Sequence, residues 1–444
     1  MSRLALLMVL SAAFAGCDSL KSDNPESCDI ASNVGHPGCP DAPPGIGGPC
    51  HDNTTCTLDG FPICDTARAG GTCVACTAAD SHQCTGTTPI CSSDEQCVRC
   101  TKHSDCAESN VCLPDGSCAL STMVAYVDGD HGVDNASCDK AHPCTKIEKA
   151  AAAAAIVKVT GTVTGKTTLD TQAVRIFADA GAKLVSTEGG DIAALEVKGN
   201  ANVEVHDLQI SRMSGANTPT VSLAGVATLA LNHVTISNTP GIGIDGTAGT
   251  LSVVRSTISG NVGGGIHLRG STHFRIIGNV VFGNGAIGKG SGGLVIGVDA
   301  PLIGDPVNEI DFNSISRNIG GDQGQGIQCT TGTSLTAHNN IIWNNGIPAG
   351  VAGPSGLFQV DGNGCSYRTS DIGPIVVANN IVQDPSFVNE PGGDLHLTAS
   401  SMVVRKADPT ANLDGLASTD IDGDARVKTG TEMAADLGAD QISK

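Results

Sequence analysis

The sequence is poor in aromatic residues and in positive charge. Aromatic residues make up 2% of the 444 residues, with one Trp, two Tyr and eight Phe, which is less aromatic surface than a compact enzyme core usually contains. Lys and Arg number 25 against 45 Asp and Glu, giving a net charge of −20. This balance argues against a nucleic-acid partner, because phosphate binding needs clustered Lys and Arg. An acidic polysaccharide could still bind at a local basic patch.

Long apolar runs are also lacking, apart from one short stretch at the N-terminus. Arg3 followed by "LALLMVLSAAFA" predicts a signal peptide over residues 1–16, since the apolar region is too short to span a bilayer. The stretch "FAGC" resembles a bacterial lipobox and indicates lipidation of Cys17. The alternative is an ordinary secretory signal with Cys17 in a disulfide. Lipidation is favoured because removing Cys17 from 19 cysteines leaves an even number.

Two segments precede the main part of the chain. Residues 17–60 show no periodicity and are rich in Pro, Gly, Asp, Asn and Ser, so an extended tether is expected. Residues 61–120 repeat one cysteine-rich unit twice and begin it a third time. Such a stretch has too few apolar residues for a core, so cross-links must hold it. It resembles the cysteine-rich spacers of secreted Gram-negative surface proteins, which implies a stiff stalk.

The cysteine spacing allows two interpretations. CxxC motifs at residues 73–76 and 97–100 match the spacing of a zinc site. Disulfides are favoured, because exported proteins retain them and because Cys84 and Cys91 supply more thiols than one tetrahedral site accepts. Later in the chain, Cys138 is expected to pair with Cys144, before a short Ala-rich helix at residues 150–155. The candidate disulfide cysteines are Cys73, Cys76, Cys84, Cys91, Cys97, Cys100, Cys106, Cys112, Cys118, Cys138, Cys144, Cys329 and Cys365.

From about residue 200 onward, short apolar segments recur roughly every two dozen residues, with insertions in the longer intervals. Each has a central apolar anchor, another apolar residue five positions earlier, and in most cases a third apolar pair a short way later. Three short strands per turn describe a right-handed parallel β-helix. The anchors are Ile210, Ile236, Ile258, Val281, Ile315, Ile342 and Val382.

Asparagines fall at constant offsets from these anchors, three residues after and two residues before. At such positions they should occupy left-handed corners of the coil and stack into hydrogen-bonded ladders. The alternative, Asn-rich loops of a β-sandwich, does not explain a constant offset over four repeats. The predicted ladder residues are Asn261, Asn284, Asn318, Asn345, Asn279, Asn313, Asn340 and Asn380.

The pattern is similar to the right-handed β-helix repeats of the pectin-lyase-like family, over about residues 123–440. "YVDGDHGVDNASC" resembles the usual N-terminal start of such a helix, and "DPSFVNEPGGDLHLTASS" resembles the C-terminal tail of secreted bacterial members. The resemblance implies an all-β fold: a right-handed parallel β-helix solenoid over residues 121–405 after a disulfide-rich stalk, with a C-terminal tail or cap over 406–444. It implies little about chemistry.

One surface patch could carry catalysis. The outward positions of the third strand should place Asp245 beside Arg269 on the adjacent coil, with His267 next to them. A polysaccharide lyase needs a base and a cation, which these residues could supply. A solvated ion pair worth less than about 1 kcal/mol is the favoured interpretation of the same three residues. No Asp-Asp dipeptide or "WIDH"-type signature is present, which lowers the expectation of a hydrolase or pectate lyase.

No cofactor is expected, and calcium is the one metal with a weak signal. Asp420, Asp422 and Asp424 alternate in "DIDGDAR", like part of a calcium loop, but no Glu follows at the expected offset. A polar turn is therefore the favoured interpretation.

Two functions remain open at this point. The first is a lipid-anchored protein of the bacterial cell envelope, at the outer membrane or cell surface, that displays a β-helix to a polysaccharide or surface protein. The second is a polysaccharide lyase or glycoside hydrolase acting on acidic polysaccharide. The missing catalytic signatures favour the first.

Overall fold

The structure is a computed structural model. It describes residues 47–442 except 58–59, 69, 188, 191, 289–291, 300–307, 321–325, 330–335, 347–359, 362–365, 368–383, 408–412, 414, 427, 430–431 and 434. The chain divides into two compact units, residues 1–121 and 122–444. Within the described residues, no helix is both long and apolar enough to cross a membrane.

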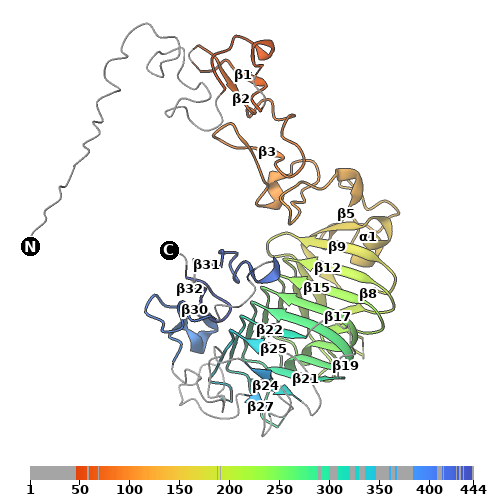
Figure 1. The fold of residues 1–444 in the computed structure, drawn as a ribbon. Helices are drawn as coiled ribbons and strands as arrows, with labels where there is room; N and C mark the ends of the chain where they lie inside the picture. The colour runs from red at the N-terminus through yellow and green to blue at the C-terminus, as the bar shows by residue number, and fades with distance from the viewer. Residues whose placement is uncertain are drawn as a thin grey trace, which may run out of the picture. The chain divides into compact units, whose positions relative to one another are not determined.

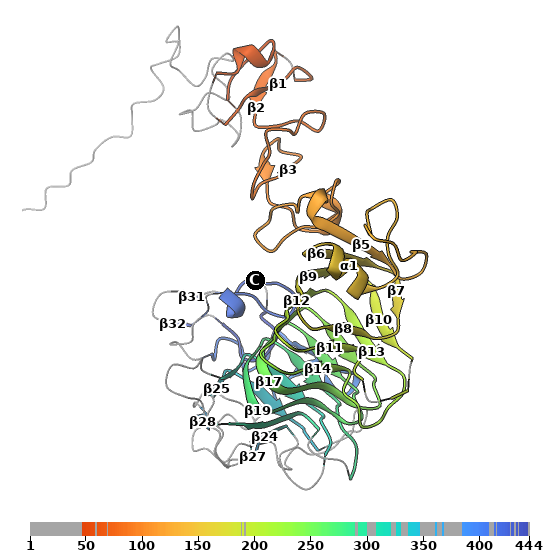
Figure 2. The same ribbon diagram turned by 90° about the vertical axis from the view of Figure 1, so that its right-hand side faces the viewer.

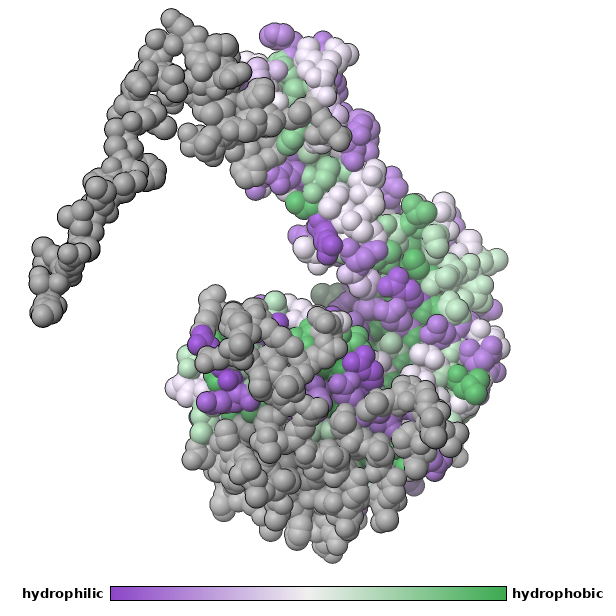
Figure 3. Space-filling view, viewed as in Figure 1, coloured by the Kyte–Doolittle hydropathy of each residue, from purple (hydrophilic) through white to green (hydrophobic). Residues whose placement is uncertain are grey.

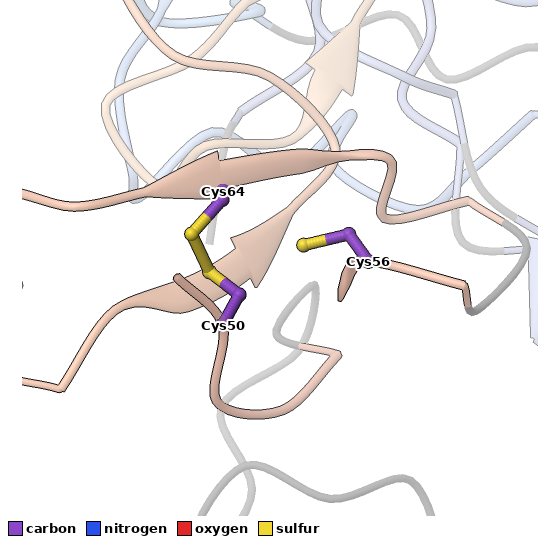
Figure 4. A group of neighbouring side chains, drawn as sticks. All are labelled: Cys50, Cys56 and Cys64. Carbon is purple, nitrogen blue, oxygen red and sulfur yellow. A yellow bond between two sulfur atoms is a disulfide. The ribbon is translucent and has the colours of Figure 1, made fainter. Parts of the chain in front are cut away.

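In the described part of the first unit, from residue 47 onward, three consecutive cysteine modules share one connectivity. In each module the first cysteine bonds the third and the second bonds the fourth, and the first such bridge is drawn in Figure 4. The third and fourth cysteines face each other across a short antiparallel pair of strands, as Cys64 and Cys73 do. The bridges are Cys50–Cys64, Cys56–Cys73, Cys76–Cys91, Cys84–Cys97, Cys100–Cys112 and Cys106–Cys118. The described elements of this unit are η1 (Asn53–Thr55), β1 (Ile63–Asp65), β2 (Thr72–Val74), β3 (Ile90–Cys91), β4 (Cys97–Val98) and η2 (His103–Asp105), and η3 (Ser121–Met123) spans the boundary with the second unit.

This arrangement confirms the favoured disulfide interpretation and corrects one boundary. The CxxC motifs at residues 73–76 and 97–100 are module boundaries, with each cysteine bonded within its own module, so these thiols are not zinc ligands. The cysteine-rich region also begins earlier than residue 61. Cys50 and Cys56 lie in the predicted tether, yet both are bonded into the first module.

The second unit confirms the predicted all-β parallel solenoid. Coils stack one below the next, as the strands β9 to β19 show in Figures 1 and 2. One sheet of eight described strands runs along one side. Its strands are β7 (Thr162–Thr164), β10 (Lys183–Ser186), β13 (Gln209–Arg212), β16 (Thr235–Ser237), β18 (Thr257–Ser259), β20 (Val280–Phe282), β23 (Ser314–Ser316) and β26 (Ile341–Trp343).

The other strands form two parallel columns, which β17 (Ile242–Val254) and β19 (Gly264–Ile277) join because each contributes to both. The first column contains β5 (Val124–Asp128), β6 (Ile156–Thr160), β9 (Ala173–Ala178), β12 (Asn202–His206), β15 (Thr228–Asn232), β22 (Glu309–Asp311), β25 (Thr336–His338) and β28 (Ser366–Tyr367). The second contains β8 (Thr167–Leu169), β11 (Leu195–Val197), β14 (Val221–Leu223), β21 (Leu294–Val298), β24 (Ile327–Cys329) and β27 (Val360–Asp361).

The apolar anchors predicted from the sequence stand in one register. Ile210 pairs with Ile236, and the pairing continues coil by coil to Ile342. These side chains are fully buried in one continuous core. The parallel register places like residues above one another, so each coil covers the apolar face of the next. The last predicted anchor, Val382, lies outside the described residues.

Two asparagine ladders run along the eight-stranded sheet, one where its strands begin and one where they end. In one ladder Asn261 donates to Asn284, Asn284 to Asn318 and Asn318 to Asn345, at 2.8–2.9 Å between side-chain atoms. In the second, Asn279 donates to Asn313 and Asn313 to Asn340 at 2.9 Å. All of these amides are buried. Asn380, the remaining predicted member, lies outside the described residues.

The ladder residues do not themselves occupy the left-handed corners, contrary to expectation. Positive φ angles occur at the residue before each ladder position, for example Asn339 (φ 59°) before Asn340 and Asn344 (φ 51°) before Asn345. At the same corner on an earlier coil stands Gly278 (φ 68°). The sharp bend at this residue turns the next side chain into the coil, where its amide can reach the neighbouring coil.

The N-terminal end of the solenoid is capped by the first helix. α1 (Ile147–Ala153) buries Ile147 and Ala150 against the first coil. The loop before it is closed by the Cys138–Cys144 disulfide. Hydrophobic residues gather over β5 and α1 in Figure 3.

From residue 384 the C-terminal segment packs along the side of the solenoid (Figures 1 and 2), so the cap begins earlier than the predicted residue 406. Its apolar residues cover Ile341 and Trp343, the outward neighbours of the anchor Ile342. Gly438 (φ 83°) approaches the solenoid so closely that a Cβ there would lie 2.6 Å from Ile341. The elements of the segment are β29 (Phe387–Asn389), η4 (Glu390–Gly392), β30 (Asp394–Leu397), η5 (Gly415–Ala417), β31 (Lys428–Thr429) and β32 (Glu432–Met433).

One carboxylate fixes this segment to the coils. Glu390 lies 2.6 Å from Ser316 Oγ, 2.7 Å from Arg317 Nη2 and 3.0 Å from Asn344 Nδ2. Arg317 is almost fully buried, so the pair is shielded from water. The segment is therefore held by both apolar contacts and a buried ion pair.

Candidate functional site

The predicted patch on the second column of strands is brought together. Asp245 on β17 and His267 on β19 are register partners on adjacent coils. Arg269, two residues further along β19, places Nη2 2.8 Å from Asp245 Oδ2. The spacing of the repeat is what aligns these three residues.

Asp245 differs electrostatically from a simple surface carboxylate. Burial raises the pKa of Asp245, and the Arg269 guanidinium lowers it in part. Its second carboxylate oxygen, Oδ1, is buried without a hydrogen-bond partner. A buried carboxylate with a raised pKa beside a cation has the properties of an acid–base group. Neither pocket described below is lined by these residues.

A groove that the sequence did not reveal lies between the eight-stranded sheet and the C-terminal segment. Two adjoining pockets with volumes of about 240 and 320 Å³ share Thr257, Val280 and Gly393 in their walls. In the larger pocket, Ser259 and Phe282 supply a hydroxyl and an aromatic ring from the outward face of the sheet. The groove therefore has a hydrogen-bonding floor with one apolar contact.

One wall of the smaller pocket carries positive charge from the solenoid. His233 Nδ1 lies 2.6 Å from Asp207 Oδ1, and this contact raises the pKa of His233. Arg255 donates to Asn232 at 2.9 Å and to Thr419 of the C-terminal segment at 3.2 Å. Both His233 and Arg255 are corner residues with positive φ, which is why they project sideways from the coil.

The opposite wall comes from the C-terminal segment and contains a histidine among carboxylates. His396 Nδ1 lies 2.6 Å from Asp394 Oδ1, and His396 Nε2 lies 3.0 Å from Asp422 Oδ2. Asp440 is buried and accepts a hydrogen bond from the backbone of Leu397 at 2.7 Å. Burial opposes protonation of His396, but Asp394, Asp422 and Asp440 together raise its pKa.

The three aspartates of the predicted calcium loop do not converge on one point. Asp420 uses both carboxylate oxygens to accept backbone N–H groups, from Asp422 and Asp424 on one side and Gln441 on the other. It therefore closes a polar turn, which is the interpretation that the sequence favoured. Asp422 instead faces His396.

Some predicted sites cannot be placed. Cys17 lies outside the described residues, as does Cys365. Cys329, another candidate disulfide cysteine, is disulfide-bonded. The groove itself gave no sequence signal, because its two walls are more than a hundred residues apart and only the docking of the C-terminal segment brings them together. The Asp-Leu-His spacing of Asp394 and His396 was the one local hint.

Comparisons with known proteins address the fold more than the chemistry. Residues 193–405 match the family described as a right handed beta helix region. Residues 15–124 match a family of unknown function, DUF8331. No curated protein matches the chain. Among solved structures, a crystal structure of pectate lyase Pel9A is similar at 12% identity with a TM-score of 0.39, covering 72% of this chain and 96% of the other.

Proposed function

Because the solenoid of this chain belongs to the right-handed β-helix family, we propose that it displays a polysaccharide-binding groove on a lipid-anchored protein of the bacterial cell envelope. The observation that carries the binding proposal is the groove beneath the C-terminal segment. Its floor offers hydroxyls and the Phe282 ring, and its end carries Arg255 and His233. Sugars are bound through such hydroxyl hydrogen bonds and ring contacts, and an acidic sugar would also meet these cations.

The anchor proposal rests on the N-terminus and the cysteine modules. "FAGC" places Cys17 where lipidation occurs in lipoproteins, and the DUF8331 match begins two residues before it. Three modules held by disulfides suit an oxidising compartment outside the cytoplasm. Together they provide an attachment point and a cross-linked spacer ahead of the solenoid.

The anchor is tested by labelling cells with a radioactive fatty acid. The wild-type chain should incorporate label and sediment with membranes, whereas Cys17→Ser should do neither. Replacement of another cysteine that is outside the modules, Cys39→Ser, is the matched control and should keep the label. Label retained by Cys17→Ser would refute the anchor.

Binding in the groove is tested by blocking it with a bulky side chain. The purified Cys17→Ser chain is titrated with a panel of neutral and uronic-acid polysaccharides, and the ligand that binds is retested against Ser259→Tyr. Ser211→Tyr is the matched control, because Ser211 occupies the same outward position two coils earlier and lines neither pocket. Loss of at least tenfold in affinity with Ser259→Tyr alone is expected. Equal affinity of the Cys17→Ser chain and of its Ser259→Tyr and Ser211→Tyr variants would exclude the groove as the binding site.

Catalysis by a polysaccharide lyase or hydrolase is the second candidate, favoured by Asp245. Its buried, partly unpaired carboxylate beside Arg269 could exchange a proton with a sugar. The same panel should then yield unsaturated products, read by ultraviolet absorbance, or new reducing ends. Turnover that Arg269→Ala abolishes and Ser259→Tyr leaves unchanged would establish the enzyme and displace the binding proposal.

A further inference from the structure

Three side chains at the end of the groove are arranged like metal ligands. His396, Asp422 and Asp440 each offer a ligand atom, and these atoms all lie within 4.8 Å of one another. Ligand atoms around a tetrahedral zinc ion are separated by about 3.3 Å, and His396 Nε2 and Asp422 Oδ2 are already 3.0 Å apart. Small side-chain rotations would bring all three onto one ion.

A fourth residue orients the histidine as metal sites require. Asp394 Oδ1 lies 2.6 Å from His396 Nδ1, so it can accept that N–H and turn Nε2 toward Asp422 and Asp440. A carboxylate that holds the second ring nitrogen of a ligating histidine is the usual outer partner in zinc sites. Asp394 and His396 are both on β30, two residues apart, so the strand itself fixes this contact.

The carboxylates around His396 also favour binding of a cation. Both nitrogens of His396 face carboxylates. Asp440 is buried, and one of its carboxylate oxygens lies within 4.8 Å of a carboxylate oxygen of Asp422. A divalent cation between them would neutralise the charge of these two carboxylates.

We propose that His396, Asp422 and Asp440 bind one divalent metal ion of the Zn²⁺ type at the wall of the smaller pocket. One imidazole nitrogen and two carboxylates suit zinc, whereas calcium prefers an all-oxygen shell. The three ligands leave at least one coordination position for water or for a ligand in the pocket. His396 and Asp422 are about half exposed, which gives the ion a path from solvent.

The site does not depend on glycan binding and is tested without a glycan. The purified Cys17→Ser chain is stripped with a chelator, dialysed against Zn²⁺ and analysed for bound metal. One equivalent is expected, with about none in His396→Ala. His142→Ala is the matched control, because His142 is an exposed histidine 3.2 Å from a single aspartate, and it should keep the ion.

Two further measurements separate metal loss from misfolding. Asp422→Asn removes a half-exposed ligand and should weaken Zn²⁺ binding at least tenfold while leaving the circular dichroism spectrum unchanged. Asp394→Asn should weaken it by about 10- to 100-fold, because only the orientation of His396 is lost. Co²⁺ should give visible absorption bands in the wild type. No uptake by the wild type, or equal uptake by His396→Ala, would overturn the proposal.

Discussion

The side-chain amide of Asn284 donates to the side-chain oxygen of Asn318 at 2.9 Å, and its own oxygen accepts from Asn261 in the same way. The Asn284 amide also donates to the carbonyl of Ile258, and its oxygen accepts the backbone N–H of Asn261. Asn284 thus bonds the coil before it and the coil after it. The ladder supplies partners for buried backbone groups at corners where the sheet bonds stop.

Removing one ladder amide should strongly destabilise the solenoid. Asn284→Ala eliminates the four side-chain hydrogen bonds and leaves buried donors and acceptors without partners. At roughly 1 kcal/mol per bond, the free energy of unfolding should fall by about 4 kcal/mol. Chemical denaturation followed by circular dichroism measures this. Asn217→Ala, at an exposed loop position, should change stability by less than about 0.5 kcal/mol. Equal effects of the two substitutions would contradict the role given to the ladder.

The solenoid could be predicted because its signals repeat. Ile236, Ile258 and Val281 are placed in register by spacing alone, and the same spacing puts Asp245 beside Arg269. Each coil must bury the same apolar positions, so a wrong alignment of one coil is revealed by the spacing of the coils next to it. The residue with the left-handed backbone at each corner could not be predicted from the sequence. His233, Arg255 and Asn339 occupy this position on different coils, yet they share no residue type.

The groove and the disulfide connectivity could not be predicted, for different reasons. Four cysteines allow three pairings, and sequence spacing does not choose among them. The groove depends on docking of the C-terminal segment, in which Glu390 meets Arg317, 73 residues earlier in the chain. That contact occurs once, so no repetition reveals it. The cluster around His396 is likewise assembled from three separate parts of one irregular segment.

Reducing the disulfides should unfold the cysteine modules while leaving the solenoid intact. Their buried apolar residues are few beyond the cysteines, such as Val74 and Val111, so each bridge of 12 to 17 residues contributes about 3 kcal/mol by restricting the unfolded chain. After dithiothreitol, a protease should digest residues 47–121 rapidly and leave a resistant fragment starting near residue 122. An untreated sample is the control. Digestion that proceeds at the same rate in both samples would mean that the bridges do not hold this unit.

Glu204 should make stability depend on pH in the acid range. Its contact with His206, helped by Arg175, lowers the pKa of Glu204 from about 4.5 to about 2. The folded state therefore binds fewer protons than the unfolded state between these values. The stabilisation is complete above about pH 4.5 and is lost as the pH falls toward 2.

The size of this effect is limited by exposure. The Glu204 side chain is 34% exposed, so water screens the interaction and about 1 kcal/mol is expected at pH 7. Glu204→Gln should lose this amount at pH 7 and almost nothing at pH 2, as measured by denaturant titration of both chains. A difference that stays constant from pH 7 to pH 2 would assign the loss to packing instead.

Loss of the Glu390 contact should release the C-terminal segment from the coils. Glu390→Ala leaves Arg317 buried without its carboxylate, which should cost about 3–5 kcal/mol. The single Trp, Trp343, reports on this event, because it is 9% exposed and packs under the segment. Its fluorescence should shift to longer wavelength, and the far-ultraviolet β signal should remain, since the core of the coils does not include the segment. Glu309→Ala breaks a more exposed pair with Arg275 and should leave Trp343 emission unchanged. If Glu390→Ala leaves the emission at the wild-type wavelength, apolar packing alone holds the segment, and the ion pair is not what fixes it.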